Sequence, residues 1–290
     1  MKKVACMGTG STDGLASQLL SKMNIILLSM QYGYQYVEIP FDDSYIKGNS
    51  GHRYGQFSTT LQNQAFDFSS FEKIHPLMFG YDKCKIINSS EGGRDYLLTQ
   101  IESSSELIIA NNFNNLFADD PKVYSLLNKV NIVNSKLLPA LYSKKNRLKV
   151  AVHVRRGDIM LHEVNFNRII DNRYFEVVVN RLIDILKILD LDYDLILHCE
   201  DDISLDFNSS YQKFVNENPI ASFMDLVTAD VIVSSKSSHS TVPSMLSGGV
   251  NIYPHDTWMV RCPGWIKADA NGAFDSEQLR SRLTSYIYLD

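Results

Sequence analysis

One stretch of the sequence, Leu148-Lys-Val-Ala-Val-His-Val-Arg-Arg-Gly-Asp158, begins as an apolar run and ends in two adjacent arginines. The run Leu148–Val154 has the length and β-branched content of a buried strand. Alternation along a strand places His153 and Arg155 on one face and Arg156 on the other. Two positive charges at the end of a buried strand are costly without an anionic partner. The stretch therefore predicts an anion site at this strand end.

Guanidinium groups suit such a site because their planar N–H donors bind phosphate oxygens in pairs. Gly157 allows the backbone to turn and a ligand to approach closely, and Asp158 is placed to hold one of the arginines. The alternatives are a surface Arg–Asp pair or a chance Arg-Gly-Asp tripeptide.

The sequence beyond this strand alternates strands and helices. Strands are expected at 193–199, 231–234 and 250–253, and helices at 174–189, 221–229, 241–246 and 275–288. This alternation is typical of a parallel sheet covered by helices on both faces, which binds ligands at the carboxyl ends of its strands. Functional residues are therefore expected directly after Val154, Cys199 and Val233.

The first half of the chain gives weaker patterns. Strands are expected at 3–7, 36–39, 84–87 and 107–110, helices at 15–32, near 61–74 and after Pro121, and a surface loop at 42–55. A length of 290 residues favours two domains. The polar break Ser143–Asn146 sets the expected domains at 1–145 and 146–290.

Composition excludes several classes of protein. The chain has 28 Lys and Arg residues against 33 Asp and Glu residues, and a net charge of −5 argues against a nucleic-acid-binding protein. No run reaches the roughly 18 apolar residues of a membrane span. The N-terminal apolar run is too short for a signal peptide, and the four cysteines have neither disulfide nor zinc spacing. These features predict a soluble, cytoplasmic protein without a metal site.

A second segment, Asp225–Ser240, predicts a helix, a strand and then a hydroxyl-rich turn into another helix. Hydroxyls and free backbone amides at a helix N-terminus form an anion site. The candidate residues of this site are Ser235, Lys236, Ser237, Ser238 and His239. The alternative is a capped helix with solvated serines.

The hexapeptide His153-Val-Arg-Arg-Gly-Asp158 resembles the donor-site motif of the α-1,2- and α-1,6-fucosyltransferases and the protein O-fucosyltransferases. The resemblance implies a GT-B-type α/β fold, in which two Rossmann-like domains with parallel sheets face a cleft. Residues 1–145 would form the acceptor-side domain and 146–290 the donor-binding domain. The last helix of the chain could pack back on the first domain.

The same resemblance implies inverting transfer of L-fucose from GDP-fucose to a glycan or glycoconjugate hydroxyl, without a metal or other cofactor. Arg155 would bind the donor β-phosphate through the transition state, and His153 would lie beside the nucleotide. Arg156 and Asp158 belong to the same donor motif. In the α-1,6 relatives an acid and paired serines contact the nucleotide, and the residues similar to them here are Asp225, Ser237 and Ser238.

Transfer to a hydroxyl needs a carboxylate or histidine within hydrogen-bond reach of the incoming oxygen. Glu163 lies ten residues after His153, and the proposed base of the α-1,6 relatives has a similar spacing from the motif. Ile159, however, replaces a lysine of those relatives. Asp13 and His52 are rival bases. His52 and Arg53 lie in the irregular segment that is expected to contact the acceptor.

The loop Gly8–Gly14 lies between an expected strand and helix, and Glu38 fits the ribose-binding acid of a dinucleotide fold. An NAD(P)-dependent oxidoreductase is therefore an alternative of another class. Asp13–Gln18 instead resembles the Gly-Leu-Gly-Asn-Gln loop of fucosyltransferase first domains. The cleft residues that this likeness implies are Gly10, Gly14 and Gln18.

Two further alternatives stay open. One is the same fold with another donor, such as UDP-xylose or another GDP- or UDP-sugar, because the motif explains diphosphate binding better than sugar identity. The other is a nucleotide-sugar- or glycan-binding protein without activity.

Overall fold

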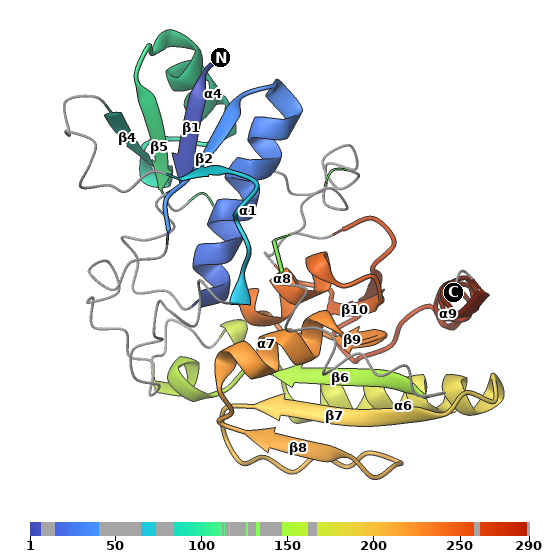
Figure 1. Cartoon of the computed structure of the whole chain (residues 1–290). Coiled ribbons are helices and arrows are strands. Elements are labelled where there is room, and N and C mark those ends of the chain that lie inside the picture. Colours follow the sequence, from blue (N-terminus) through green and yellow to red (C-terminus); the bar gives the residue numbers. More distant parts are fainter. Residues whose placement is uncertain are drawn as a thin grey trace. The chain divides into compact units, whose positions relative to one another are not determined.

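The computed structural model describes residues 1–6, 15–40, 65–73, 84–111, 113, 116, 126, 132–133, 147–161, 167–257 and 262–288. The chain divides into two compact units, an N-terminal unit (Met1–Asn134) and a C-terminal unit (Ser135–Asp290). The expected boundary at residue 145 lies outside the described residues. Figure 1 shows the elements of both units.

Within the described residues, the N-terminal unit is a parallel sheet in the order β3-β2-β1-β5-β4. Its elements are β1 (Lys3–Cys6), α1 (Leu15–Tyr32), β2 (Gln35–Glu38), β3 (Glu72–Lys73), β4 (Cys84–Asn88), a 3-10 helix at Ser89–Glu91, α4 (Arg94–Ser103) and β5 (Leu107–Asn111). The central strand β1 is buried from Val4 to Cys6, as expected for an apolar run covered on both faces.

The C-terminal unit has a parallel sheet in the order β11-β10-β9-β6-β7-β8. Its strands are β6 (Leu148–Val154), β7 (Tyr193–Cys199), β8 (Gln212–Val215), β9 (Val231–Val233), β10 (Val250–Pro254) and β11 (Ile266–Ala268). Its helices are α6 (Asn172–Ile188), α7 (Pro219–Val227), α8 (Ser238–Leu246) and α9 (Ser276–Tyr288), with a 3-10 helix at Gly157–Leu161. The predicted α/β class, with a parallel sheet in each half, is confirmed, whereas a cleft shared by the two sheets stays a prediction.

The strand order of the C-terminal unit fixes where a ligand can bind. The chain starts in the middle with β6, adds β7 and β8 on one side, and returns to add β9, β10 and β11 on the other. This is the doubly wound order of dinucleotide-binding folds, whose ligands lie at the carboxyl ends of the strands where the winding reverses. In this sheet the reversal lies between β6 and β9.

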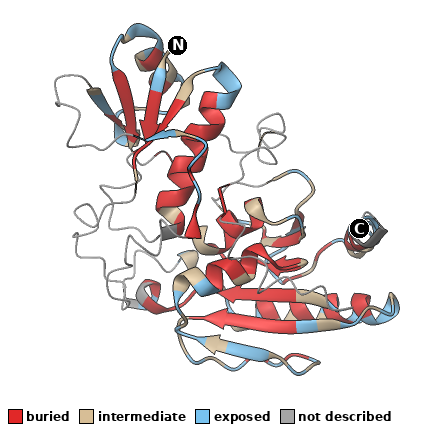
Figure 2. Ribbon diagram, in the orientation of Figure 1, coloured by how far each residue is buried: buried red, intermediate tan, exposed pale blue. Residues whose placement is uncertain are grey.

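Different helices cover the two faces of this sheet. Val150, Val152 and Val154 of β6 belong to the core cluster that contains the apolar residues of α6 and α9. Ala151 of β6 packs instead with Leu226 of α7. The even-numbered residues of β6 therefore face α6, and the odd-numbered residues face α7. Figure 2 shows the burial of β6 and β7 and the greater exposure of the edge strand β8.

One expectation was wrong and others were incomplete. Residues 72–73, expected near the end of a helix, form β3, because they pair with Val37 and Glu38 at the sheet edge. The helix α4 and the short strands β8 and β11 were not predicted. The expected loop at 42–55 and the expected start of a helix after Pro121 lie outside the described residues.

A buried ion pair joins α1 to the end of β2. The Lys22 ammonium lies 2.6 Å from Oε1 of Glu38 and also donates to the carbonyl of Ile39. The Tyr36 hydroxyl donates to Glu38 Oε2 over 2.6 Å. Glu38 is 1% exposed, so its carboxylate cannot also hold a ribose. This burial removes the acid on which the oxidoreductase alternative relied.

We predict that Glu38→Gln lowers the free energy of unfolding by about 3–5 kcal/mol, because it removes the negative charge that pairs with the buried Lys22 ammonium. The matched control is Glu72→Gln, since Glu72 pairs with Lys3 at the surface and both side chains are 43% exposed. That change should cost less than about 1 kcal/mol. Chemical denaturation measures both values, and equal losses would contradict the assignment.

Candidate functional site

The two sequence segments that predicted an anion site meet where the sheet reverses its winding. β6 and β9 pair with Val152 opposite Val233, so the residues that follow these strands are neighbours. His153 Nδ1 lies 2.8 Å from the Ser235 hydroxyl, which joins the two strand ends directly. Backbone register therefore brings the ends of β6 and β9 together, and a buried hydrogen bond joins them.

The N-terminus of α8 lies at the same point. Ser237 caps the helix, its hydroxyl accepting a hydrogen bond from the amide of His239 over 3.2 Å. The Ser240 hydroxyl accepts a hydrogen bond from the Ser235 amide and so holds the preceding turn. The rings of His153 and His239 have centroids 5.3 Å apart. A helix N-terminus with its partial positive charge thus faces the end of β6.

The charge of Arg155 acts on both His153 and His239, as expected for a side chain on the same face as His153. The pairing of Val154 with Cys199 places the next residue of β7's chain, Glu200, opposite Arg155. The Arg155 guanidinium donates to Oε1 of Glu200, while the backbone amide of Arg156 donates to Oε2 over 2.7 Å. The side chains of Arg155 and Glu200 are 10% and 18% exposed. The Arg155 side chain is therefore held against Glu200 rather than extended into solvent.

Arg156 points to the other face and braces the loop there. Its guanidinium donates to the carbonyls of Arg155 and Ile170, each over 2.8 Å, and to Oδ1 of Asn172 over 2.6 Å. Burial lowers the pKa of this guanidinium. These acceptors tie the end of β6 to the start of α6, so the two adjacent arginines have different surroundings and different partners.

The two histidines of the site are uncharged. Burial lowers the pKa of His153 well below its ordinary value, with smaller effects from His239 and Arg155. Burial, with the nearby charge of Arg155, lowers the pKa of His239 to about 3. Nε2 of His239 lies 2.8 Å from the Ser222 hydroxyl. At neutral pH both imidazoles act as hydrogen-bonding groups, and Arg155 supplies the positive charge among them.

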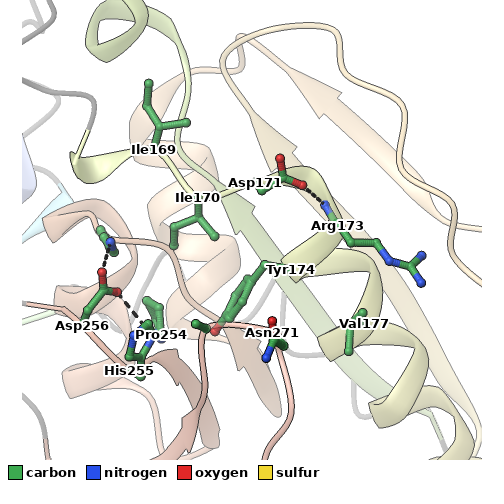
Figure 3. Close-up of a pocket in the computed structure, with 12 residues that line it drawn as sticks. Ile169, Ile170, Asp171, Arg173, Tyr174, Val177, Pro254, His255, Asp256 and Asn271 are labelled. Atoms are coloured by element: carbon green, nitrogen blue, oxygen red, sulfur yellow. Dashed lines mark hydrogen bonds and ion pairs between the residues drawn. The ribbon is translucent and has the colours of Figure 1, made fainter.

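Lys236 lines a cavity of about 510 Å³ beside the start of α6. Its ammonium is held by the Asp256 carboxylate and by the carbonyl of Asn167. Figure 3 shows Ile170, just before α6, and Tyr174, in the first turn of α6, facing Pro254 at the end of β10 and His255 after it. The charge of Lys236, expected at the α8 turn, is thus paired within the wall of this cavity.

Asp225 is engaged in a separate network between α7 and the sheet. Its carboxylate accepts hydrogen bonds from Lys149 Nζ, and its Oδ2 lies 3.4 Å from Nε2 of the buried His198. Burial acts to raise the Asp225 pKa, but the hydrogen bonds from His198 and Lys149 outweigh it and the pKa is lowered. The acid expected to contact a nucleotide is therefore already paired inside the unit.

The remaining expected residues divide into two groups. Ser238 begins α8, Asp158 lies in the 3-10 helix after β6, and Gln18 is buried on α1. Ile159, which replaces a lysine of the relatives, is fully buried. The expected residues that lie outside the described part of the chain are Gly10, Asp13, Gly14, His52, Arg53 and Glu163.

Glu200 directly follows Cys199, where the sequence placed functional residues, but its pairing with Arg155 was not predicted, and Ser222 and Asp256 were not placed in the site. That pairing could have been found by counting along two parallel strands, because equal distances past Val154 and Cys199 put Glu200 opposite Arg155. No sequence signal marked Ser222 or Asp256, whose partners come from other loops. Among the described residues, no group of His, Cys, Asp and Glu side chains is arranged to hold a metal ion. No described helix is long and apolar enough to cross a membrane.

We predict that acidification destabilises the protein through His239. Its folded-state pKa of about 3 lies below the ordinary 6.5, so the unfolded chain binds a proton that the folded protein excludes. The stabilisation is complete above about pH 6.5 and is lost as the pH falls toward 3, by about 2 kcal/mol at pH 5.

The test compares free energies of unfolding at about pH 7.5 and about pH 5. His239→Gln should lose about 2 kcal/mol less than the wild type on acidification. The control is His255→Gln, because His255 is partly exposed beside Asp256, and it should behave as the wild type. An equal loss for the wild type and His239→Gln would refute the assignment.

No family model matches this chain, and no curated protein sequence matches it. The chain is similar to solved structures of fucosyltransferases. NodZ α-1,6-fucosyltransferase co-crystallised with GDP has a TM-score of 0.49 and 13% identity, over 94% of this chain and 97% of that chain. Fucosyltransferase NodZ from Bradyrhizobium has a TM-score of 0.46 and 13% identity, over 85% and 93%. POFUT1 in complex with GDP-fucose has a TM-score of 0.47 and 10% identity, over 92% and 96%. At these low scores, the case for a function rests on the residues of the site.

Proposed function

We propose that the C-terminal unit binds the diphosphate of a nucleotide sugar and that the protein is a glycosyltransferase. One observation carries the proposal: where the doubly wound sheet reverses, the His153–Ser235 hydrogen bond joins the end of β6, which leads into Arg155, to the turn that leads into α8. The charge of Arg155 acts on His239, in the first turn of α8. A bidentate cation beside a helix N-terminus is suited to two linked phosphates. The site of a diphosphate is therefore the carboxyl end of β6 and β9.

The proposed reaction is metal-independent and inverting. Arg155 and the backbone amides at the start of α8 would stabilise the negative charge that grows on the diphosphate as it leaves. The acceptor oxygen would attack the anomeric carbon from the face opposite the diphosphate. As the new C–O bond forms, the bond to the diphosphate breaks, and its electron pair stays on the phosphate oxygen.

The proposed donor is GDP-fucose and the proposed acceptor is a glycan hydroxyl. The support for fucose is the likeness of the motif that begins at His153 to the fucosyltransferase donor motif. Another GDP- or UDP-sugar, such as UDP-xylose, keeps the same diphosphate chemistry and is the alternative. Acceptor contacts are assigned to the N-terminal unit, with His52 and Arg53 as candidates.

We predict that the wild type releases nucleotide from one member of a panel of GDP- and UDP-sugars. Arg155→Ala should lower kcat/KM for that release by about 100-fold or more, since an electrostatic contact to the developing charge is lost. The control is Arg147→Ala, which removes the same charge at the amino end of β6, where Arg147 pairs with Asp194 at the surface. That variant should keep its activity.

The same assay separates the alternatives. Activity should persist in EDTA, and its loss there would overturn metal independence. Stabilisation by NADH and by none of the nucleotides would favour the oxidoreductase. Binding of a nucleotide sugar without hydrolysis or transfer would favour a binding protein, and full activity in Arg155→Ala would overturn the proposed site.

A carboxylate must remove the acceptor proton, and Glu163 is the proposed base. We predict that Glu163→Gln lowers the rate of transfer by about 10²–10⁴-fold while the affinity for GDP stays unchanged. Asp13→Asn and His52→Gln, which remove the rival bases, are measured beside it with a mixture of oligosaccharide acceptors. A large loss in either rival, with Glu163→Gln active, would reassign the base.

A further inference from the structure

Glu200 occupies an unusual position for a carboxylate. It directly follows β7, and strand register sets it opposite Arg155. One of its oxygens accepts from the Arg155 guanidinium and the other from the backbone amide of Arg156. A guanidinium and a main-chain amide are both among the donors that commonly bind phosphate oxygens in proteins. Glu200 therefore uses the donors that the proposed diphosphate needs.

The loop after β6 is shaped around this carboxylate. Gly157 has a φ of +68°, and a Cβ on it would lie 3.0 Å from Cβ of Glu200. The Gly157 amide donates to Oδ2 of Asp201 over 3.2 Å, so two consecutive acidic residues hold the loop. A side chain at 157 would be strained in φ and crowded against Glu200. The position of Glu200 is thus part of the construction of the loop.

The ion pair is also mostly shielded from solvent. Only 10% of the Arg155 side chain and 18% of the Glu200 side chain are exposed, so the two charges interact more strongly than a surface pair would. An incoming anion meets a guanidinium whose charge is already balanced. It must therefore compete with Glu200 for Arg155.

We propose that Glu200 is an internal counter-ion for Arg155, which takes the place of the diphosphate in the empty site and yields Arg155 to it on binding. During this exchange Glu200 still accepts the hydrogen bond from the Arg156 backbone amide, and it therefore acts as a positioning residue. The inference rests on the proposed function. The exchange weakens the binding of the nucleoside diphosphate and thereby favours its release as product.

The test is Glu200→Gln, which removes the charge and keeps the shape and an oxygen acceptor. GDP and inorganic pyrophosphate are titrated by calorimetry at fixed salt. GDP should bind about tenfold tighter to the variant, because a like charge beside the phosphates is removed. In the donor assay, KM should fall while kcat does not rise. A merely structural role predicts weaker binding and a lower melting temperature.

The matched control is Asp202→Asn, two residues further along. Asp202 is 77% exposed on its side chain and pairs with Lys213, so its loss changes the net charge equally but away from Arg155. Its affinity for GDP should stay within about twofold of the wild type, since exposed charges are screened. An equal gain in Asp202→Asn, or no gain in Glu200→Gln, overturns the inference.

The two ligands separate this inference from the proposed function. Tighter pyrophosphate binding to Glu200→Gln without any binding of nucleotide supports the counter-ion and overturns the nucleotide proposal. Unchanged GDP binding overturns the counter-ion alone, and binding of neither ligand to either protein overturns both. If Glu200→Gln does not fold, the same titrations are made with Glu200→Ala, which also removes the carboxylate, and the same outcomes support or overturn the inference.

Discussion

The register of β6 with its two neighbours is the constraint on which the candidate site depends. Pairing with β7 puts Glu200 opposite Arg155, and pairing with β9 brings Ser235 to His153. A slip of one residue along β6 would turn Arg155 to the α6 face and bury its charge among apolar side chains. The apolar residues of β6 that face α6 prevent this slip, because they belong to the core cluster that they share with α6 and α9. Core packing therefore fixes the chemistry at the strand end.

The two adjacent arginines have different roles, although the motif suggested diphosphate binding for both. Arg156 is bound by carbonyls and Asn172, so its charge stabilises the turn between β6 and α6. Arg155 is held by a carboxylate that an anion can replace. Because His153 and His239 are uncharged, Arg155 is the residue that supplies an exchangeable positive charge among the described residues around the start of α8. This arrangement reconciles a chain of net charge −5 with a proposed anionic substrate.

Much of the C-terminal unit could be predicted because its central strands are mostly apolar. Alternation alone also gave the correct faces for Arg155 and Arg156. The strands β8 and β11 were missed, since β8 is largely exposed and β11 has three residues. Side-chain pairs between distant segments could not be predicted from the sequence. Asp225 was expected to contact a ligand, but in the structure Lys149 and His198 hold its carboxylate. Lys236 likewise depends on Asp256, 20 residues away.

The central claim is that Arg155 exchanges its partner for a diphosphate while Arg156 does not. NMR of the protein with ¹⁵N-labelled arginine side chains, titrated with GDP, tests it most directly, with the two signals assigned through Arg155→Lys and Arg156→Lys. The account predicts a saturable shift of the Arg155 Nε–H signal and little change in that of Arg156. A bound GDP that leaves Arg155 unchanged, or that shifts Arg156 instead, would contradict it.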